Sequence, residues 1–115
     1  MQDLHDWITQ LQNTDKLIIV EGKKDKLALE QFGIQNILTL NKPIFSIIEL
    51  VAESHKECII LSDLDREGKK IYSALKHGLQ RNGVKIDTVF REFLFKKTKI
   101  TNIEGITSCL RMQNL

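Results

Sequence analysis

Two aspartates separated by one residue, Asp63 and Asp65, follow directly after the apolar run 58–61. A short continuous apolar run of this kind is typical of a strand covered on both faces of a sheet. Side chains two residues apart on extended backbone point to the same side, so both carboxylates can face one point beyond the strand. Because hard cations such as Mg²⁺ prefer oxygen ligands of this kind, the spacing predicts a metal site there.

A second apolar run, 17–20, ends in a similar way, with Glu21 and Gly22. If the two strands are neighbours in a parallel sheet, Glu21 stands beside the aspartate pair. Three carboxylates at close range repel one another, and a divalent cation relieves that repulsion. The three acids therefore predict a site for Mg²⁺ or Mn²⁺ that acts on phosphodiesters, where a metal would neutralise charge on the phosphate oxygens.

Each motif alone has a plainer structural explanation, because acidic residues commonly cap helices and turns that follow strands. Asp-x-Asp also closes a strand in phosphatases that use the first aspartate as a nucleophile. The upstream pair Glu21-Gly22 argues against that alternative. What favours metal chemistry is that both motifs close a strand in a regular alternation of strands and helices.

Hydrophobic periodicity predicts the elements that would position these acids. The predicted helices are 3–12, 23–32, 44–54 and 66–81, and the predicted strands are 17–20, 37–40, 58–61 and 84–90. This alternation predicts an α/β fold with a four-stranded, mainly parallel sheet and helices on both faces. Segment 84–90 alternates apolar and polar residues, which favours a strand near the sheet edge. In helix 23–32 we expect Leu27, Ala28 and Phe32 to face inward.

Ligands of such sheets bind beyond the carboxyl ends of the strands, where the strand order reverses. A strand order of 2-1-3-4 makes the first and third strands neighbours and places the reversal between them. All three acids then meet at one point.

The C-terminal segment is less regular. Asn102 is a candidate cap for a short helix that runs through Arg111. Phe93 and Phe95 are expected to pack under that helix, although stacking on bases is the alternative. Both this segment and the helix that carries Trp7 can pack either on the domain or on a partner.

Length and composition are ordinary for one globular domain. The chain has 115 residues, 42% of them hydrophobic, and a net charge of +2, which by itself does not indicate a nucleic-acid partner. Cys58 opens an apolar run, so we expect a core thiol. The N-terminus lacks the features of a signal peptide, and no apolar run has membrane-spanning length. These observations predict a cytoplasmic protein with no membrane partner.

The chain resembles the Toprim domain, which topoisomerases, bacterial-type primases, certain recombination proteins and small maturation nucleases share. The resemblance rests on VEGKKD at 20–25 and SDLDREG at 62–68, and it covers about residues 15–92. It implies a Rossmann-like three-layer fold with sheet order 2-1-3-4, within one domain of residues 1–115 that also includes the C-terminal segment 93–115. In size and in its sequence motifs the chain is most similar to primase-like members and to the ribonuclease that matures 5S ribosomal RNA.

The resemblance also implies roles for individual residues. The glutamate that matches Glu21 acts as a general acid or base, and the aspartates that match Asp63 and Asp65 hold the metal. We expect Glu21 to contribute to the metal site as well. Gly22 and Gly68 are expected to let the backbone turn tightly beside the acids.

Residues near the acids are candidates for contacts with phosphate or nucleic acid. They are Lys23, Lys24, Asp25, Arg66 and Lys69. For the lysines, a solvated face is the alternative. In topoisomerases the motif Asp-Arg-Glu-Gly is usually followed by another acidic residue. Here Lys69 occupies that position, and the missing carboxylate disfavours a two-metal site. Glu67 either substitutes in part or is a first-turn acid that the helix dipole favours.

Two functions follow from the resemblance. The first is an enzyme that hydrolyses or forms phosphodiester bonds in RNA or DNA with Mg²⁺, and it is favoured as a maturase-like or primase-like nuclease. The second is a module that binds Mg²⁺ and nucleic acid without turnover and recruits partners in repair, replication or RNA metabolism. A protein partner or a homodimer is compatible with both.

Overall fold

Four parallel strands form the sheet in the predicted order. A computed structural model describes the backbone of residues 1–113 and the side chains of residues 1–110. The order is β2-β1-β3-β4, where β1 is Leu17–Val20, β2 is Ile37–Thr39, β3 is Glu57–Leu61 and β4 is Lys85–Asp87. β1 lies beside β3 with Val20 opposite Leu61, so the residues after both strands leave the sheet at the same edge.

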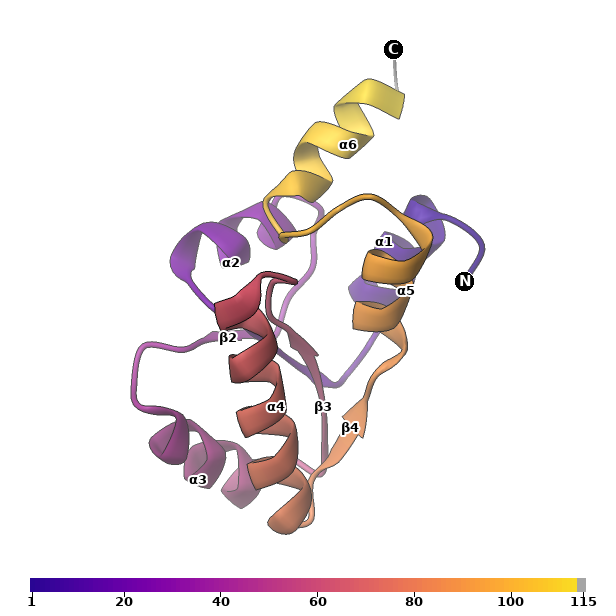
Figure 1. Cartoon of the computed structure of the whole chain (residues 1–115). Helices are drawn as coiled ribbons and strands as arrows, with labels where there is room; N and C mark the ends of the chain where they lie inside the picture. Colours follow the sequence, from indigo (N-terminus) through magenta and orange to yellow (C-terminus); the bar gives the residue numbers. More distant parts are fainter. Residues whose placement is uncertain (114–115) are drawn as a thin grey trace.

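Helices cover both faces of the sheet (Figure 1). Within the described residues they are α1 (Leu4–Gln12), α2 (Lys23–Glu30), α3 (Ile44–Ser54), α4 (Arg66–Arg81), α5 (Val89–Lys97) and α6 (Gly105–Gln113). α3 and α4 pack on one face, and the other four helices pack on the opposite face. The predicted helices 44–54 and 66–81 have the observed bounds.

The central strands feed two cores because successive side chains alternate between faces. Ile18 and Val20 belong to the core under α1, α2, α5 and α6, whereas Leu17 and Ile19 belong to the core under α3 and α4. Every residue of β1 is buried, as the continuous apolar run predicted. A strand fixed on both faces gives the residue that follows it a well-defined position.

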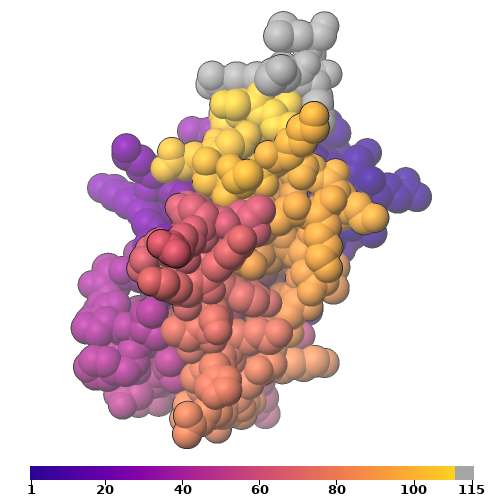
Figure 2. All heavy atoms as spheres, viewed as in Figure 1, coloured from indigo at the N-terminus to yellow at the C-terminus, as the bar shows by residue number. Residues whose placement is uncertain are grey.

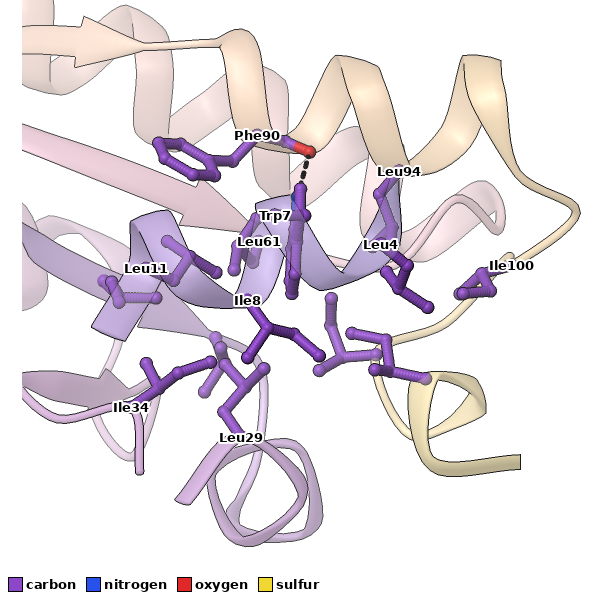
Figure 3. Packing of buried hydrophobic residues seen from close by; sticks show 14 of the residues in the cluster. Leu4, Trp7, Ile8, Leu11, Leu29, Ile34, Leu61, Phe90, Leu94 and Ile100 are labelled. Atoms are coloured by element: carbon purple, nitrogen blue, oxygen red, sulfur yellow. Dashed lines mark hydrogen bonds between the residues drawn. The ribbon is translucent and has the colours of Figure 1, made fainter. Parts of the chain in front are cut away.

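The N-terminal helix packs on the domain. Trp7 is fully buried, and its indole Nε1 donates a hydrogen bond to the carbonyl oxygen of Phe90 at 2.9 Å. The two aromatic rings lie edge to face with centroids 6.3 Å apart. Figure 3 shows this contact among the side chains of α1, α2 and α5. The helix that carries Trp7 is thus part of one of the two cores.

The predicted strand 84–90 is wrong in its second half. β4 ends at Asp87, and residues 89–97 form α5, which was not predicted. The Asp87 carboxylate accepts a hydrogen bond from Val89 N at 3.1 Å, and this turn leads the chain out of the sheet. Phe90 and Leu94 are buried four residues apart, so the helical period determines which side chains reach the core here.

The inward face of α2 also differs from the prediction. Leu27 is 49% exposed, while Leu29 is fully buried beside Ala28. The helix ends at Glu30 rather than residue 32, and Gly33 follows it with a φ of +74°, a conformation that favours glycine. α2 is thus rotated about its axis relative to the predicted orientation. Leu27 is exposed to solvent on the side of α2 that faces β2.

The C-terminal segment folds back over the carboxyl edge of the sheet. Asn102 Oδ1 accepts a hydrogen bond from Gly105 N at 2.8 Å, which is the predicted capping role. Ile100, Ile103 and Ile106 are buried in the same core as Trp7. Figure 2 shows this segment, from orange to yellow, covering one end of the molecule between α2 and α5. The expectation that the helix runs through Arg111 agrees with the backbone of α6.

Two further expectations concern burial and hydropathy. Cys58 is fully buried as predicted, and burial raises the pKa of its thiol to about 12, so it is inert at neutral pH. Among the described residues, no helix has the length and apolar character needed to cross a membrane.

Candidate functional site

Glu21 and Asp63 lie side by side at the carboxyl ends of β1 and β3. Glu21 follows Val20, the last residue of β1, and its Oε2 accepts a hydrogen bond from Asp63 N at 2.7 Å. The parallel pairing of β1 and β3 brings these residues together across 42 positions of sequence. The sheet thus produces the closeness that the two motifs predicted.

Each of the three acidic side chains accepts a hydrogen bond from a backbone amide. Besides the Glu21 contact, Asp63 Oδ1 accepts from Ile103 N at 3.1 Å, and Asp65 Oδ1 accepts from Gly68 N at 2.7 Å. Asp65 is thereby the N-cap of α4. In this conformation, no three His, Cys, Asp or Glu side chains of the described residues are close enough to hold a metal ion together.

The charges at this edge nevertheless suit a cation. Burial raises the pKa of Glu21, and the nearby charges of Asp63 and Asp65 raise it further. Burial also raises the pKa of Asp63, as do Asp65 and Glu104. The donors are carboxylate oxygens whose mutual repulsion Arg91 offsets only in part, and relieving such repulsion is what Mg²⁺ does. The carboxylate oxygens present are thus the kind of ligand that such an ion prefers.

Arg91 of α5 binds the loop that carries the two aspartates, residues 62–65, which is called the acidic loop below. α5 lies on the face of the sheet opposite to α4, the helix that follows this loop. Its Nε donates to the carbonyl oxygen of Ser62 at 3.1 Å, and its Nη2 donates to that of Asp63 at 2.9 Å. The guanidinium lies 4.2 Å from the ring centre of Tyr72 and 5.1 Å from that of Phe95. α4 and α5, on opposite faces, are therefore joined by one side chain beyond the end of β3.

Arg91 is the residue that sequence reasoning missed. The sequence places it in a basic C-terminal segment, where it has the same appearance as a solvated lysine. Burial lowers its pKa, whereas the charges of Glu21 and Asp63 raise it, so it belongs to the electrostatics of the acids. Only its hydrogen bonds to the carbonyl oxygens of Ser62 and Asp63 reveal that its side chain reaches the residues after β3.

Gly68 is required by a close approach within the loop. A Cβ at Gly68 would lie 2.1 Å from the carbonyl oxygen of Asp63, a distance that no side chain tolerates. Ser62 Oγ donates to the carbonyl oxygen of Gly68 at 2.8 Å and ties the start of α4 to the end of β3. Gly22 differs, because its backbone is extended and a Cβ there would meet nothing closer than 4.0 Å. The chain does bend at Gly22, but neither its backbone angles nor a close approach requires a glycine there.

Asp25 has a structural role that the sequence did not suggest. It is 7% exposed, and its Oδ2 accepts a hydrogen bond from Gly22 N at 3.0 Å in a capping box at the start of α2. Burial raises the pKa of Asp25 to about 6, with Asp63 as a further cause. This buried carboxylate faces its own helix start, so direct contact with nucleic acid is unsupported.

The basic candidates lie around the acids and face solvent. They are Lys23, Lys24, Arg66 and Lys69, and all four are exposed. Glu67 is also exposed in the first turn of α4, and its charge raises the pKa of Glu21. A cluster of exposed cations next to partly buried acids is compatible with a polyanionic substrate.

The Toprim domain family matches residues 16–91, which include both acidic motifs. The chain belongs to the Toprim domain family. A UPF0292 protein of Methanocaldococcus jannaschii is 35% identical over 104 residues, which cover 86% of this chain and 81% of that protein. A UPF0292 protein of Pyrococcus abyssi is 36% identical over 100 residues, covering 86% and 75%. A solved structure of an Aquifex aeolicus protein is 34% identical with a TM-score of 0.85, and the match covers 91% of this chain and 99% of that one.

Membership of the Toprim family gives the fold a general meaning. Toprim domains are metal-binding, nucleic-acid-related folds. An aspartate-nucleophile phosphatase of unrelated ancestry is thereby excluded. The matched range spans the whole sheet with α2, α3 and α4, whereas α1, α6 and most of α5 lie outside it.

Proposed function

We propose that this Toprim protein hydrolyses phosphodiester bonds of RNA or DNA with the help of Mg²⁺, in the manner of a maturation nuclease. The observation that carries the proposal is the hydrogen bond from the backbone amide of Asp63 to the Glu21 carboxylate, which brings two acidic residues with raised pKa values together beyond adjacent parallel strands. Acids with perturbed pKa values at the carboxyl edge of an α/β sheet are typical of functional sites.

In this proposal Asp63 and Asp65 hold the metal and Glu21 transfers a proton. Bound Mg²⁺ would stabilise charge on the phosphate oxygens and orient the attacked group. Burial shifts the pKa of Glu21 upward, toward neutral pH, which suits a general acid or base. Arg91 and Gly68 fix the backbone of the loop that carries the aspartates.

We also infer that the whole described chain acts as one domain. α1 buries Trp7 against α5, and the C-terminal segment supplies the amide of Ile103 to Asp63. Both flanking segments thus support the acidic loop. A cytoplasmic location and a homodimer or protein partner remain part of the proposal without bearing on the chemistry.

The test is metal-dependent cleavage of a panel of labelled single- and double-stranded RNA and DNA. Native protein is compared with Asp65→Asn, which removes a charge but keeps a good helix cap. Asp3→Asn is the matched control, because Asp3 caps α1 through the amide of Asp6, away from the acids. We expect cleavage by the native protein and the control but not by Asp65→Asn. Equal cleavage by all three would reject the proposal.

The second candidate is a module that binds Mg²⁺ and nucleic acid without turnover. One observation favours it: each of the three acids is engaged by a backbone amide in this conformation. The absence of an acid at Lys69 points the same way. This candidate predicts salt-dependent binding of the oligonucleotides with no product at any Mg²⁺ concentration.

A further inference from the structure

A cavity of about 620 Å³ opens beside Glu21, on the side away from Asp63. Lys23, Lys26 and Leu27 of α2 form one wall, and Leu40 and Asn41 after β2 form the other. In Figure 1, α2 and the connection from β2 to α3 border this region at the left of the view. Leu40 N donates to the carbonyl oxygen of Glu21 at 3.4 Å. Glu21 therefore belongs both to the cavity wall and to the group of acids.

The lining combines four kinds of chemistry, one of them acidic, because the carboxylates of Glu21 and Glu30 belong to it beside the lysines. Leu27 and Leu40 provide apolar surface, and 49% of Leu27 is exposed although it lies on a helix that packs against the core. Lys23 and Lys26 are one helical turn apart and both reach the cavity, whereas their neighbour Lys24 does not. Asn41 offers both a donor and an acceptor at the rim.

We propose that this cavity holds one unpaired nucleotide of a nucleic-acid strand, next to the phosphate that the acids receive. The base would lie against Leu27 and Leu40, and the lysines would bind the phosphate of the same nucleotide. The volume suits a single small ligand. A base pair would require a second base and strand in the same space. The inference rests on the proposed function only in naming the substrate class, namely single-stranded or frayed RNA or DNA.

The phosphate contacts are tested by binding in the presence of EDTA, which separates binding from cleavage. The probe is a short fluorescein-labelled single strand, and the readout is the dissociation constant at several salt concentrations. The double variant Lys23→Gln/Lys26→Gln is compared with Lys56→Gln/Lys85→Gln, which removes the same charge at two exposed lysines beside the amino ends of β3 and β4, outside the cavity. We expect the first to raise Kd about tenfold and to reduce the salt slope by about 1.4, because each phosphate contact on a single strand contributes about 0.7. The second should leave the slope near the native value.

The base contact is tested with two exposed leucines. Leu27→Ser is compared with Leu50→Ser, since Leu50 is similarly exposed, at 44%, but lies on α3 outside the cavity. We expect Leu27→Ser alone to weaken binding of the native strand, and to have no effect on a strand made of abasic nucleotides. A blunt duplex should bind less tightly than either of its strands. Thermal unfolding of each variant checks that it remains folded.

The outcomes separate this inference from the proposed function. Weaker binding by the cavity variants, without cleavage by the native protein, would support the cavity and reject hydrolysis. Cleavage by the native protein, with equal binding by cavity and control variants, would reject the cavity alone. A duplex that binds more tightly than the single strand, or no binding at all in EDTA, also rejects the inference.

Discussion

The two edges of the sheet both carry clustered charge, and they manage it differently. At the amino edge, beside the starts of β1 and β3, Lys16 Nζ lies 2.7 Å from Asp87, which ends the short edge strand β4, and 3.3 Å from Glu57, so both acids have a cation within the protein. At the carboxyl edge, Glu21 and Asp63 meet without such a cation and are held by backbone amides instead. Arg91 comes close, but its guanidinium donates to carbonyl oxygens of the loop.

The difference separates a structural cluster from a candidate site. Ion pairing within the chain satisfies the acids of the amino edge, so nothing further is needed there. The acids of the carboxyl edge keep raised pKa values from burial and mutual repulsion. A fold that leaves such charge uncompensated favours a ligand that supplies the missing positive charge.

The largest effect should come from removing charge at one edge and then at the other. Glu21→Gln retains an acceptor for Asp63 N but cannot transfer a proton, so we expect cleavage to fall by about 100-fold or more. Lys16→Met should leave cleavage unchanged. Initial rates at saturating Mg²⁺ measure both variants, and a similar loss in the two would remove the distinction between the edges.

The next largest effect should be on stability, when Arg91 is removed from the loop that carries Asp63. Arg91→Met leaves the two carbonyl oxygens without their donor, and each such charge-assisted hydrogen bond contributes about 1.5–3 kcal/mol. We expect the free energy of unfolding in urea to fall by about 3 kcal/mol. Arg91→Lys should recover part of it through one donor. A loss below about 0.5 kcal/mol, the usual range for surface substitutions, would show that the loop keeps its conformation without the Arg91 hydrogen bonds.

Asp25 tests the carboxyl edge through pH. Its folded pKa of about 6 lies above its ordinary value of 3.8, so its contribution to stability is full below the lower value and is lost as pH rises through the higher one. Asp25→Asn keeps an acceptor for Gly22 N without the charge. At pH 7 in EDTA we expect this variant to be more stable than the native protein by at most about 3 kcal/mol, because one pKa unit corresponds to about 1.4 kcal/mol.

The stability advantage of Asp25→Asn should disappear by about pH 3, where the carboxyl is largely protonated in both the folded and the unfolded state. Paired thermal melts across this range measure the difference. An advantage that stays constant with pH would show that the charge of Asp25 is not its cause.

The smallest effect is expected at the amino edge. Lys16→Met should lower the free energy of unfolding by about 1 kcal/mol at pH 7, since the pairs are partly exposed. The hydrogen bond to Asp87 raises the pKa of Lys16, so this contribution persists below the usual lysine pKa and is lost as pH rises through the raised value. Chemical unfolding at low and high salt measures it, and a loss that salt does not reduce would argue against ion pairing.

Sequence patterns predicted the central architecture because it depends on local signals. The apolar runs 17–20 and 58–61 are continuous, and a strand buried on both faces has no polar position to disturb that signal. Helices 44–54 and 66–81 carry strong apolar periodicity and end at the expected residues. The prediction for segment 84–90 was wrong because a three-residue edge strand leads almost directly into a helix. The order of apolar and polar residues there is compatible with both the strand period of 2 and the helical period of 3.6.

The sequence by itself determined the acids, their place after two buried strands and the glycine at position 68, since these depend on short-range spacing. The tertiary structure decided that Asp25 caps its own helix, that Arg91 crosses to the acidic loop, and that Ile103 supplies an amide to Asp63. It also decided that Lys26 and Leu27, but not Lys24, line a cavity. Contacts across 28 to 40 positions depend on how helices dock on the sheet, and no local pattern records that docking.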